Sequence, residues 1–133
     1  MGDIRGERGT MLPALGGLLF VGLIVLALCV DVAALHATYV RVSTVADAAA
    51  EAGASMIDVS ALHEGTISLD QGTAASVASD WVTGAGLQAR AIEVGAERVC
   101  VESMEDHHTI ALGIIGLRRV EVVVRACAEP AVG

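Results

Sequence analysis

Glu105, Asp106, His107 and His108 form a cluster of adjacent side chains that offers both carboxylate and imidazole groups. Such groups bind divalent metals when several of them converge on one point. Adjacent histidines in a strand or loop point apart, however, and no further Cys or His follows at ligand spacing. The cluster therefore favours a solvated polar turn, and we expect neither a metal nor another cofactor.

Two cysteines are the other candidates for chemistry. Cys100 lies in the alternating run RVCVES, and Cys127 lies in the alternating run RRVEVVVRACA. Both runs are typical of strands, and each cysteine falls on the more polar side of its strand, beside Arg98 and Arg125 respectively. If the strand register places the cysteines opposite each other, a disulfide forms in an oxidising compartment. In any other register they are two buried or unpaired thiols.

The motifs of common enzymes do not occur in this sequence. It has no nucleophile elbow, no glycine-rich phosphate loop and no HExxH zinc motif. The formal net charge is -8, and nearly all of the excess acid follows residue 30. Nucleic-acid binding requires clustered basic side chains, because they must neutralise phosphates. We therefore expect neither an enzyme nor a partner made of nucleic acid.

Residues 10–30, TMLPALGGLLFVGLIVLALCV, form an uncharged apolar run that ends at Asp31. About 20 such residues allow a helix to cross the hydrocarbon core of a bilayer. A cleaved signal peptide has a shorter apolar region, and a chain of this size could not surround the run as a buried core helix. We therefore expect a retained single-pass anchor, in which Cys29 is a small packing or lipid-facing residue.

Charge on the two sides of the anchor predicts its orientation. Arg5 and Arg8 precede the apolar run, and basic residues favour the cytoplasmic side of a membrane. The N-terminus is then cytoplasmic, and the chain beyond Asp31 is outside. The expected organisation is a cytoplasmic segment (1–9), a transmembrane helix (10–30), an extracytoplasmic helical stalk (31–59) and a small α+β domain (60–133).

Beyond the anchor, the apolar positions recur in alternating steps of three and four, which is the spacing of a helix that packs along one face. The pattern predicts one continuous helix from about residue 11 to about residue 56, roughly 70 Å long. Small residues dominate this seam, so it suits close packing, either among many copies of the chain or against its own small domain. The seam consists of Val32, Leu35, Tyr39, Val42, Ala46, Ala49, Gly53 and Met56.

The remaining residues predict a small α+β domain. Residues 60–71 lack helical periodicity and are expected to form a loop, followed by a helix that Asp70 caps and that ends near Val82. Its expected apolar face is Ala74, Val77, Ala78 and Trp81. Strands are expected over 98–103 and 118–128, joined by a long loop into an antiparallel hairpin, and residues 91–94 could add a third strand.

The N-terminal half resembles the N-terminal segment of TadE/TadG-like proteins of the tight-adherence (Flp) pilus system. That segment reads as Arg-Gly, an apolar helix, an Asp at its outer end and a helix that closes in ADAAALAGA. The matching residues are Arg8, Gly9, Asp31, the stretch 46–50 that contains Asp47, and Gly53-Ala54. The C-terminal LGIIGLRRVEVVVRACAEP also looks like the closing strand of the family.

The resemblance implies a pilin-like or pilus-assembly protein in the bacterial cytoplasmic membrane or its surface pilus. Its partners would be the lipid bilayer and other pilus subunits or assembly proteins, copies of itself included. Processed pilins carry a Glu early in the mature helix, where this chain has Ala14. We therefore expect residues 1–9 to be retained, as in the TadG-like branch. The alternative is a single-pass, membrane-anchored binding module unrelated to pili.

Overall fold

A single long helix organises the structure, a computed structural model that describes residues 11–131. Helix α1 runs without interruption over Met11–Ala54, which confirms the expected continuous helix. It ends two residues earlier than predicted, because Ile57 pairs with Leu69 in an isolated β-bridge and the Asp58 amide donates to the Ser68 carbonyl. The extended backbone that these contacts require begins at once after the last helical turn.

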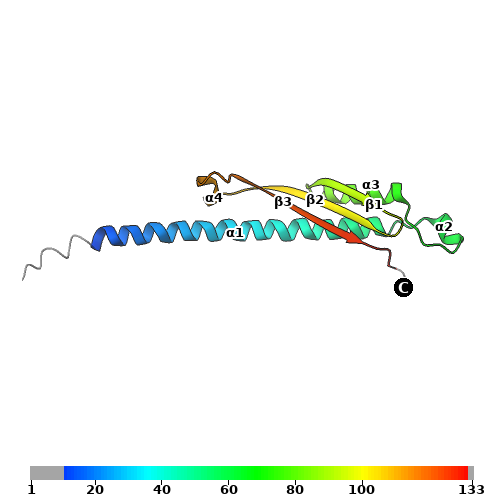
Figure 1. Ribbon diagram of the computed structural model, residues 1–133, viewed down its shortest axis with the longest axis horizontal. Helices are drawn as coiled ribbons and strands as arrows, with labels where there is room; N and C mark the ends of the chain where they lie inside the picture. Colours follow the sequence, from blue (N-terminus) through cyan, green and yellow to red (C-terminus); the bar gives the residue numbers. More distant parts are fainter. Residues whose placement is uncertain (1–10, 132–133) are drawn as a thin grey trace, which may run out of the picture.

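A three-stranded antiparallel sheet packs on the second half of α1. Its strands β1 (Gln88–Val94), β2 (Val99–His108) and β3 (Arg119–Ala128) are arranged in the order β1-β2-β3. Helix α3 (Gln71–Gly84) lies beside them on the same side of α1 (Figure 1). The expected α+β arrangement, with a long helix followed by a small antiparallel domain, is therefore confirmed.

Several loop and strand boundaries differ from the sequence-based expectation. The loop expected at 60–71 begins with a short helix, α2 (Val59–His63), because the Asp58 carboxylate accepts from the Ser60 and Ala61 amides at its start. Strand β2 continues to His108, five residues beyond the expected end. The rest of the expected loop contains a single helical turn, α4 (Ala111–Ile114).

The core is built from small side chains where three elements meet. Val42, Ala46 and Ala49 of α1 are fully buried, and the partners on α3 and β2 are equally small. Asp70 caps α3 as expected, but the prediction that Trp81 belongs to its apolar face was wrong. Trp81 is exposed, and Val82 is buried in its place together with Ala74 and Ala78. The wide indole does not fit between two helices that approach through alanines.

The two halves of α1 have opposite environments. Apart from the partly buried Ala27, residues 12–30 are exposed, although almost all are apolar, and their mean hydropathy is high enough for a membrane span. The segment expected as a stalk instead forms one wall of the core. Six of its residues within 42–54 are buried: Val42, Ala46, Ala49, Ala50, Gly53 and Ala54. Figure 1 shows α4 at the end of the domain nearest the apolar half of α1 and α2 at the far end.

Candidate functional site

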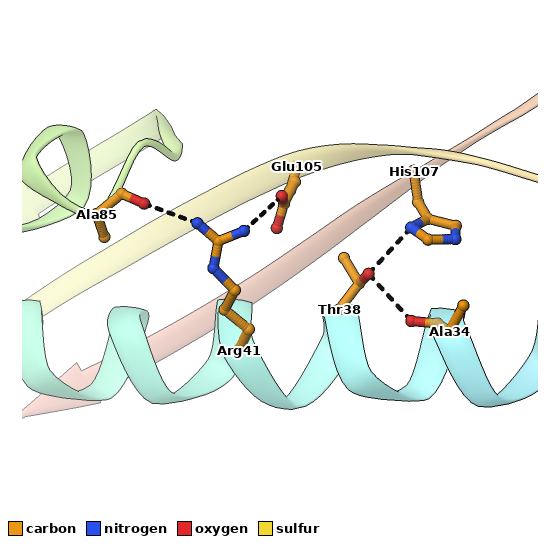
Figure 2. A network of polar contacts seen from close by, with 6 residues as sticks. All are labelled: Ala34, Thr38, Arg41, Ala85, Glu105 and His107. Carbon is orange, nitrogen blue, oxygen red and sulfur yellow. Dashed lines mark hydrogen bonds and ion pairs between the residues drawn. The ribbon is translucent and has the colours of Figure 1, made fainter.

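Polar contacts join α1 to strand β2 at the end of the domain that lies nearest the apolar half of α1. Arg41 of α1 donates to Glu105 Oε1 at 2.8 Å and to the Ala85 carbonyl at 2.8 Å. One turn earlier, Thr38 Oγ1 lies 3.0 Å from His107 Nδ1 and donates to the Ala34 carbonyl at 3.1 Å (Figure 2). Because the hydroxyl has a single proton and gives it to Ala34, Nδ1 of His107 is the donor to Thr38. These contacts fix the rotation of α1 against β2.

Asp31 makes the third contact, at the point where the apolar run ends. Its side chain is buried, and its two carboxylate oxygens accept from the Ile110 amide at 3.0 Å and the Leu112 amide at 2.9 Å. The amides of Leu112 and Ile110 hold the pKa of this carboxyl below its usual range, and burial only partly opposes them. Asp31 therefore supplies the cap of α4, since Ile110 provides no side-chain cap of its own.

The cluster Glu105–His108 is divided between the two faces of the sheet. Glu105 and His107 point toward α1, where they contact Arg41 and Thr38, whereas Asp106 and His108 occupy the alternate positions of β2. Among residues 11–131, no group of three or more His, Cys, Asp or Glu side chains is placed to hold a metal ion. The chemistry of this cluster is structural pairing within the domain.

Cys100 and Cys127 lie directly opposite each other in the β2–β3 register and are joined by a disulfide. They lie on the face of the sheet that points away from α1. Ion pairs cross the strands on the same face, with Arg125 bound to Glu93 at 2.6 Å and Arg90 bound to Glu121 at 2.8 Å. Exposed ion pairs of this kind contribute little to stability. The disulfide joins β2 and β3 covalently and so restricts the unfolded chain as well.

The predicted seam divides into a buried part and an exposed part. Val42, Ala46, Ala49 and Gly53 pack against α3 and β2, and the half-buried Leu35 and Met56 lie at the margins. The seam is thus occupied by the chain's own domain over residues 42–53. Val32 and Tyr39, the other two members of the seam, are exposed, because the chain's own domain leaves them uncovered.

Of the other residues singled out in the sequence, Asp47 is exposed on α1, and Cys29 is exposed within the apolar run. Arg8 and Gly9 lie outside the described residues, as does the segment 1–9.

Thr38 and Arg41 were missed by sequence reasoning. Their spacing was the available signal. Asp31, Thr38 and Arg41 are polar residues within an apolar stretch, and steps of seven and three residues place them on neighbouring parts of the helix surface.

A shallow groove lies between α1 and α3. It has a volume of about 510 Å³ and is lined by Thr44, Val45 and Ala48 of α1 and by Asp80, Trp81, Gly84 and Ala85 on the other side. Trp81 is the only tryptophan of the chain, and it stands exposed at this groove. The groove has a mostly apolar lining and no cluster of convergent polar groups, which suits a protein contact better than a small polar ligand.

Comparison of the chain with protein-family models, with curated protein sequences and with solved structures finds no match.

Proposed function

We propose that this chain is a membrane-anchored, pilin-like or pilus-assembly protein of a tight-adherence (Flp) pilus system. It acts through helix packing and protein–protein contacts and carries out no catalysis. Residues 10–30 cross the bacterial cytoplasmic membrane, residues 1–9 remain in the cytoplasm, and the small domain lies outside. The proposal rests on the sequence resemblance and on the division of α1 into two halves.

The division of α1 is the structural observation that supports the proposal best. One rigid helix is exposed and apolar in its first half and is part of a folded domain in its second half. The domain therefore has a fixed orientation relative to the apolar half. Such a subunit suits assembly by lateral packing of helices, because each copy presents the same helix face at the same height.

An exposed stripe on α1 is available for that packing. Val25, Val32 and Tyr39 recur at seven-residue intervals, the heptad spacing that brings side chains to one side of a helix. All three are exposed, and the domain of the same chain leaves them uncovered. Neighbouring helices in an assembly would cover this stripe, which continues from the apolar half of α1 into the half beside the domain.

The second candidate function is a membrane-anchored binding module unrelated to pili. The groove between α1 and α3 favours it, because the exposed Trp81 offers the kind of aromatic anchor that dominates many protein interfaces. The two functions thus place the working surface on different elements. The pilus function uses the α1 stripe, and the binding function uses the groove.

Substitution of two equally exposed aromatic residues distinguishes between these two functions. Tyr39 and Trp81 are each 52% exposed, and neither belongs to the buried core. In a strain lacking the gene, surface pili should disappear and should return when the wild-type chain is expressed. At matched protein level, Tyr39→Ala should reduce piliation, whereas Trp81→Ala should restore it fully. Normal piliation in the deletion strain would exclude an assembly role. Loss of piliation with Trp81→Ala alone would move the working surface to the groove.

The orientation is tested separately with a reporter fused after Gly133. An enzyme that is active only outside the cytoplasm should be active in this fusion, and an enzyme that is active only inside should be inactive. The opposite pattern would reverse the proposed topology. Neighbouring genes give a further check, since genes for a secretion ATPase and paired Tad membrane proteins support the pilus function and their absence supports the binding module.

A further inference from the structure

Helix α4 lies at the end of the domain nearest the apolar half of α1 (Figure 1). The loop around α4 exposes four large apolar side chains. Their exposed fractions are 75% for Ile110, 86% for Ile114, 73% for Ile115 and 54% for Leu117. The whole segment 110–117, IALGIIGL, carries no charged residue. A soluble surface rarely concentrates apolar side chains in this way, so the tip is a contact surface.

The tip is an ordered element that the rest of the fold holds in place. At its base, Thr109 donates through its hydroxyl to the Leu117 carbonyl and through its amide to the Arg118 carbonyl. Gly116 has a positive φ of 100°, which lets the chain reverse direction after α4. Asp31 binds the Ile110 and Leu112 amides and so ties the tip to α1.

The position of Asp31 sets the height of the tip along α1. Asp31 is the residue that follows the uncharged run 10–30, and α4 is bound directly to it. When the run crosses a bilayer, its last residue lies at the outer boundary of the hydrocarbon region. The tip then lies at the same boundary, on the side of α1 where the domain sits.

Two arginines follow the tip, and they differ from the others in the described part of the chain. Arg41, Arg90, Arg98 and Arg125 each pair with a carboxylate. Among residues 11–131, Arg118 and Arg119 are the arginines without an acidic partner, and both are exposed. Two unpaired cations beside an uncharged apolar tip match the order of groups in a phospholipid, with phosphates above acyl chains.

We propose that the α4 tip inserts into the outer interface of the bilayer that α1 spans, as a second membrane contact of the domain. Ile110, Ile114, Ile115 and Leu117 enter the boundary of the acyl chains, and Arg118 and Arg119 bind the phosphate oxygens of anionic lipids. Interfacial elements of this kind bury their apolar face about 5–10 Å deep. The inference rests on the proposed membrane anchoring, but it adds a surface that the anchor does not require.

A bilayer is the occupant that this geometry favours. Because Asp31 holds the tip at the level where the apolar run ends, lipid surrounds it on every side that α1 and the sheet leave free. The contact with lipid also fixes the tilt of the domain, since two points of attachment restrict rotation about α1.

The test uses the full chain, reconstituted in vesicles of phosphatidylcholine and phosphatidylglycerol, with a fluorophore sensitive to polarity on a single free cysteine. The probe position is Ile114→Cys in a Cys29→Ser background, with the disulfide kept intact. The control is Val59→Cys in the same background, an exposed aliphatic position on α2 at the opposite end of the domain. The native Cys29, labelled in the unaltered chain, reports whether the apolar run itself lies in the bilayer.

We expect the emission at position 114 to shift to the blue and to be quenched by spin-labelled lipids, while position 59 stays unquenched. Arg118→Gln combined with Arg119→Gln should reduce the quenching at position 114, and this difference should vanish in vesicles of phosphatidylcholine alone. A label at position 114 that stays in water while Cys29 is quenched would overturn the inference and leave the anchor standing.

Two further outcomes separate the remaining explanations. A blue-shifted label at position 114 that lipid quenchers do not reach, and that returns to water when the protein is diluted with excess lipid, would show a second copy over the tip and overturn the proposal. A label at Cys29 that remains unquenched would contradict membrane anchoring. It would also overturn the proposed lipid contact of the tip, because that contact depends on the anchor.

Discussion

The Asp31 carboxylate and the Leu112 amide, 81 residues apart in the sequence, are joined by a hydrogen bond of 2.9 Å. The contact connects the residue at which the apolar run of α1 ends with the helical turn that connects β2 and β3. It explains why an acidic residue is suited to this position. A carboxylate offers two acceptors, and here both bind backbone amides that no other side chain satisfies. In the proposed orientation, the charge at the edge of the membrane is therefore paired within the protein.

The first prediction concerns Asp31 and pH. The folded-state pKa of Asp31 is lowered, so its contribution to stability is fully present above the unfolded value of about 4. It is lost as the pH falls through the folded pKa, when the carboxyl takes up a proton and can no longer accept two amide hydrogen bonds. Asp31→Asn should unfold at a lower temperature than the wild type at pH 7, and the difference should shrink in acid.

Thermal unfolding of the full chain in detergent micelles, followed by circular dichroism between pH 7 and pH 3, measures this effect. Asp80→Asn is the control, because Asp80 is exposed on α3 and makes no such contact. A difference between Asp31→Asn and the wild type that is the same at both ends of the pH range would contradict the assignment. The hydroxyls of Ser60 and Thr73, followed by backbone amides at the starts of α2 and α3, also lower the pKa values of Asp58 and Asp70. The wild type should therefore lose further stability in acid.

The second prediction concerns the close approach of α1 to α3 at Gly53. A Cβ added at Gly53 would lie 3.1 Å from the Ala74 carbonyl oxygen and 3.1 Å from Val99 Cγ1. The carbonyl belongs to the backbone of α3 and cannot move away alone. Gly53→Ala should therefore destabilise the domain, by about 1–3 kcal/mol, which is typical of overpacking.

Gly22→Ala is the matched control for this substitution. It lies in the same helix, and an added Cβ there meets nothing within 4 Å. It should leave the unfolding of the domain unchanged. Denaturant titration of both variants, monitored by Trp81 fluorescence, tests the pair. Equal stability of Gly53→Ala and the wild type would show that α1 and α3 are packed less closely than the structure has them.

Local signals in the sequence were sufficient for the main elements. The apolar run followed by steps of three and four predicted α1, and Asp70 before an apolar periodic stretch predicted the start of α3. Such signals depend on neighbouring residues only. The third strand was also indicated, although β1 extends from Gln88 to Val94 and the sequence suggested residues 91–94.

Contacts over long sequence separations account for what the sequence could not predict. Strand β2 reaches His108 because Glu105 and His107 find partners on α1, so its inner face becomes polar where alternation predicts apolar residues. The turn at α4 depends on Asp31, which lies 79 residues before Ile110. The exposure of Trp81 depends on how closely α1 approaches α3. None of these relationships leaves a pattern within a short window of sequence.

The third prediction concerns a buried hydroxyl without a partner. Ser103 is fully buried on the inner face of β2, and its Oγ has no hydrogen-bond partner among the described residues. Removing an unsatisfied buried hydroxyl relieves its desolvation cost. Ser103→Ala should therefore leave stability unchanged or raise it by up to about 1 kcal/mol.

Thr109→Val is the contrasting variant. Thr109 is also buried, but its hydroxyl donates to the Leu117 carbonyl at the base of the α4 tip. The valine keeps the shape and removes the donor, so this variant should lose about 1 kcal/mol. Both free energies of unfolding come from the same denaturant titration. A loss for Ser103→Ala as large as that for Thr109→Val would show that Ser103 has a partner in solution.

The last prediction concerns the disulfide and the compartment of the domain. Cys100 and Cys127 lie opposite each other in the β2–β3 register, and their bond closes the loop that contains the α4 tip. Replacing both with Ser should destabilise the domain by about 2–5 kcal/mol.

In cells, the bond persists only where the compartment is oxidising. The wild-type chain from an exporting host should therefore give linked peptides around these cysteines in non-reducing mass spectrometry. A variant whose apolar run is interrupted by Leu23→Arg with Ile24→Arg should stay in the cytoplasm and give free thiols. Free thiols at both positions in the wild-type chain would contradict the exported orientation or the strand register. The stability of the double serine variant distinguishes these two causes, since only a wrong register leaves purified, oxidised protein unaffected by the substitutions.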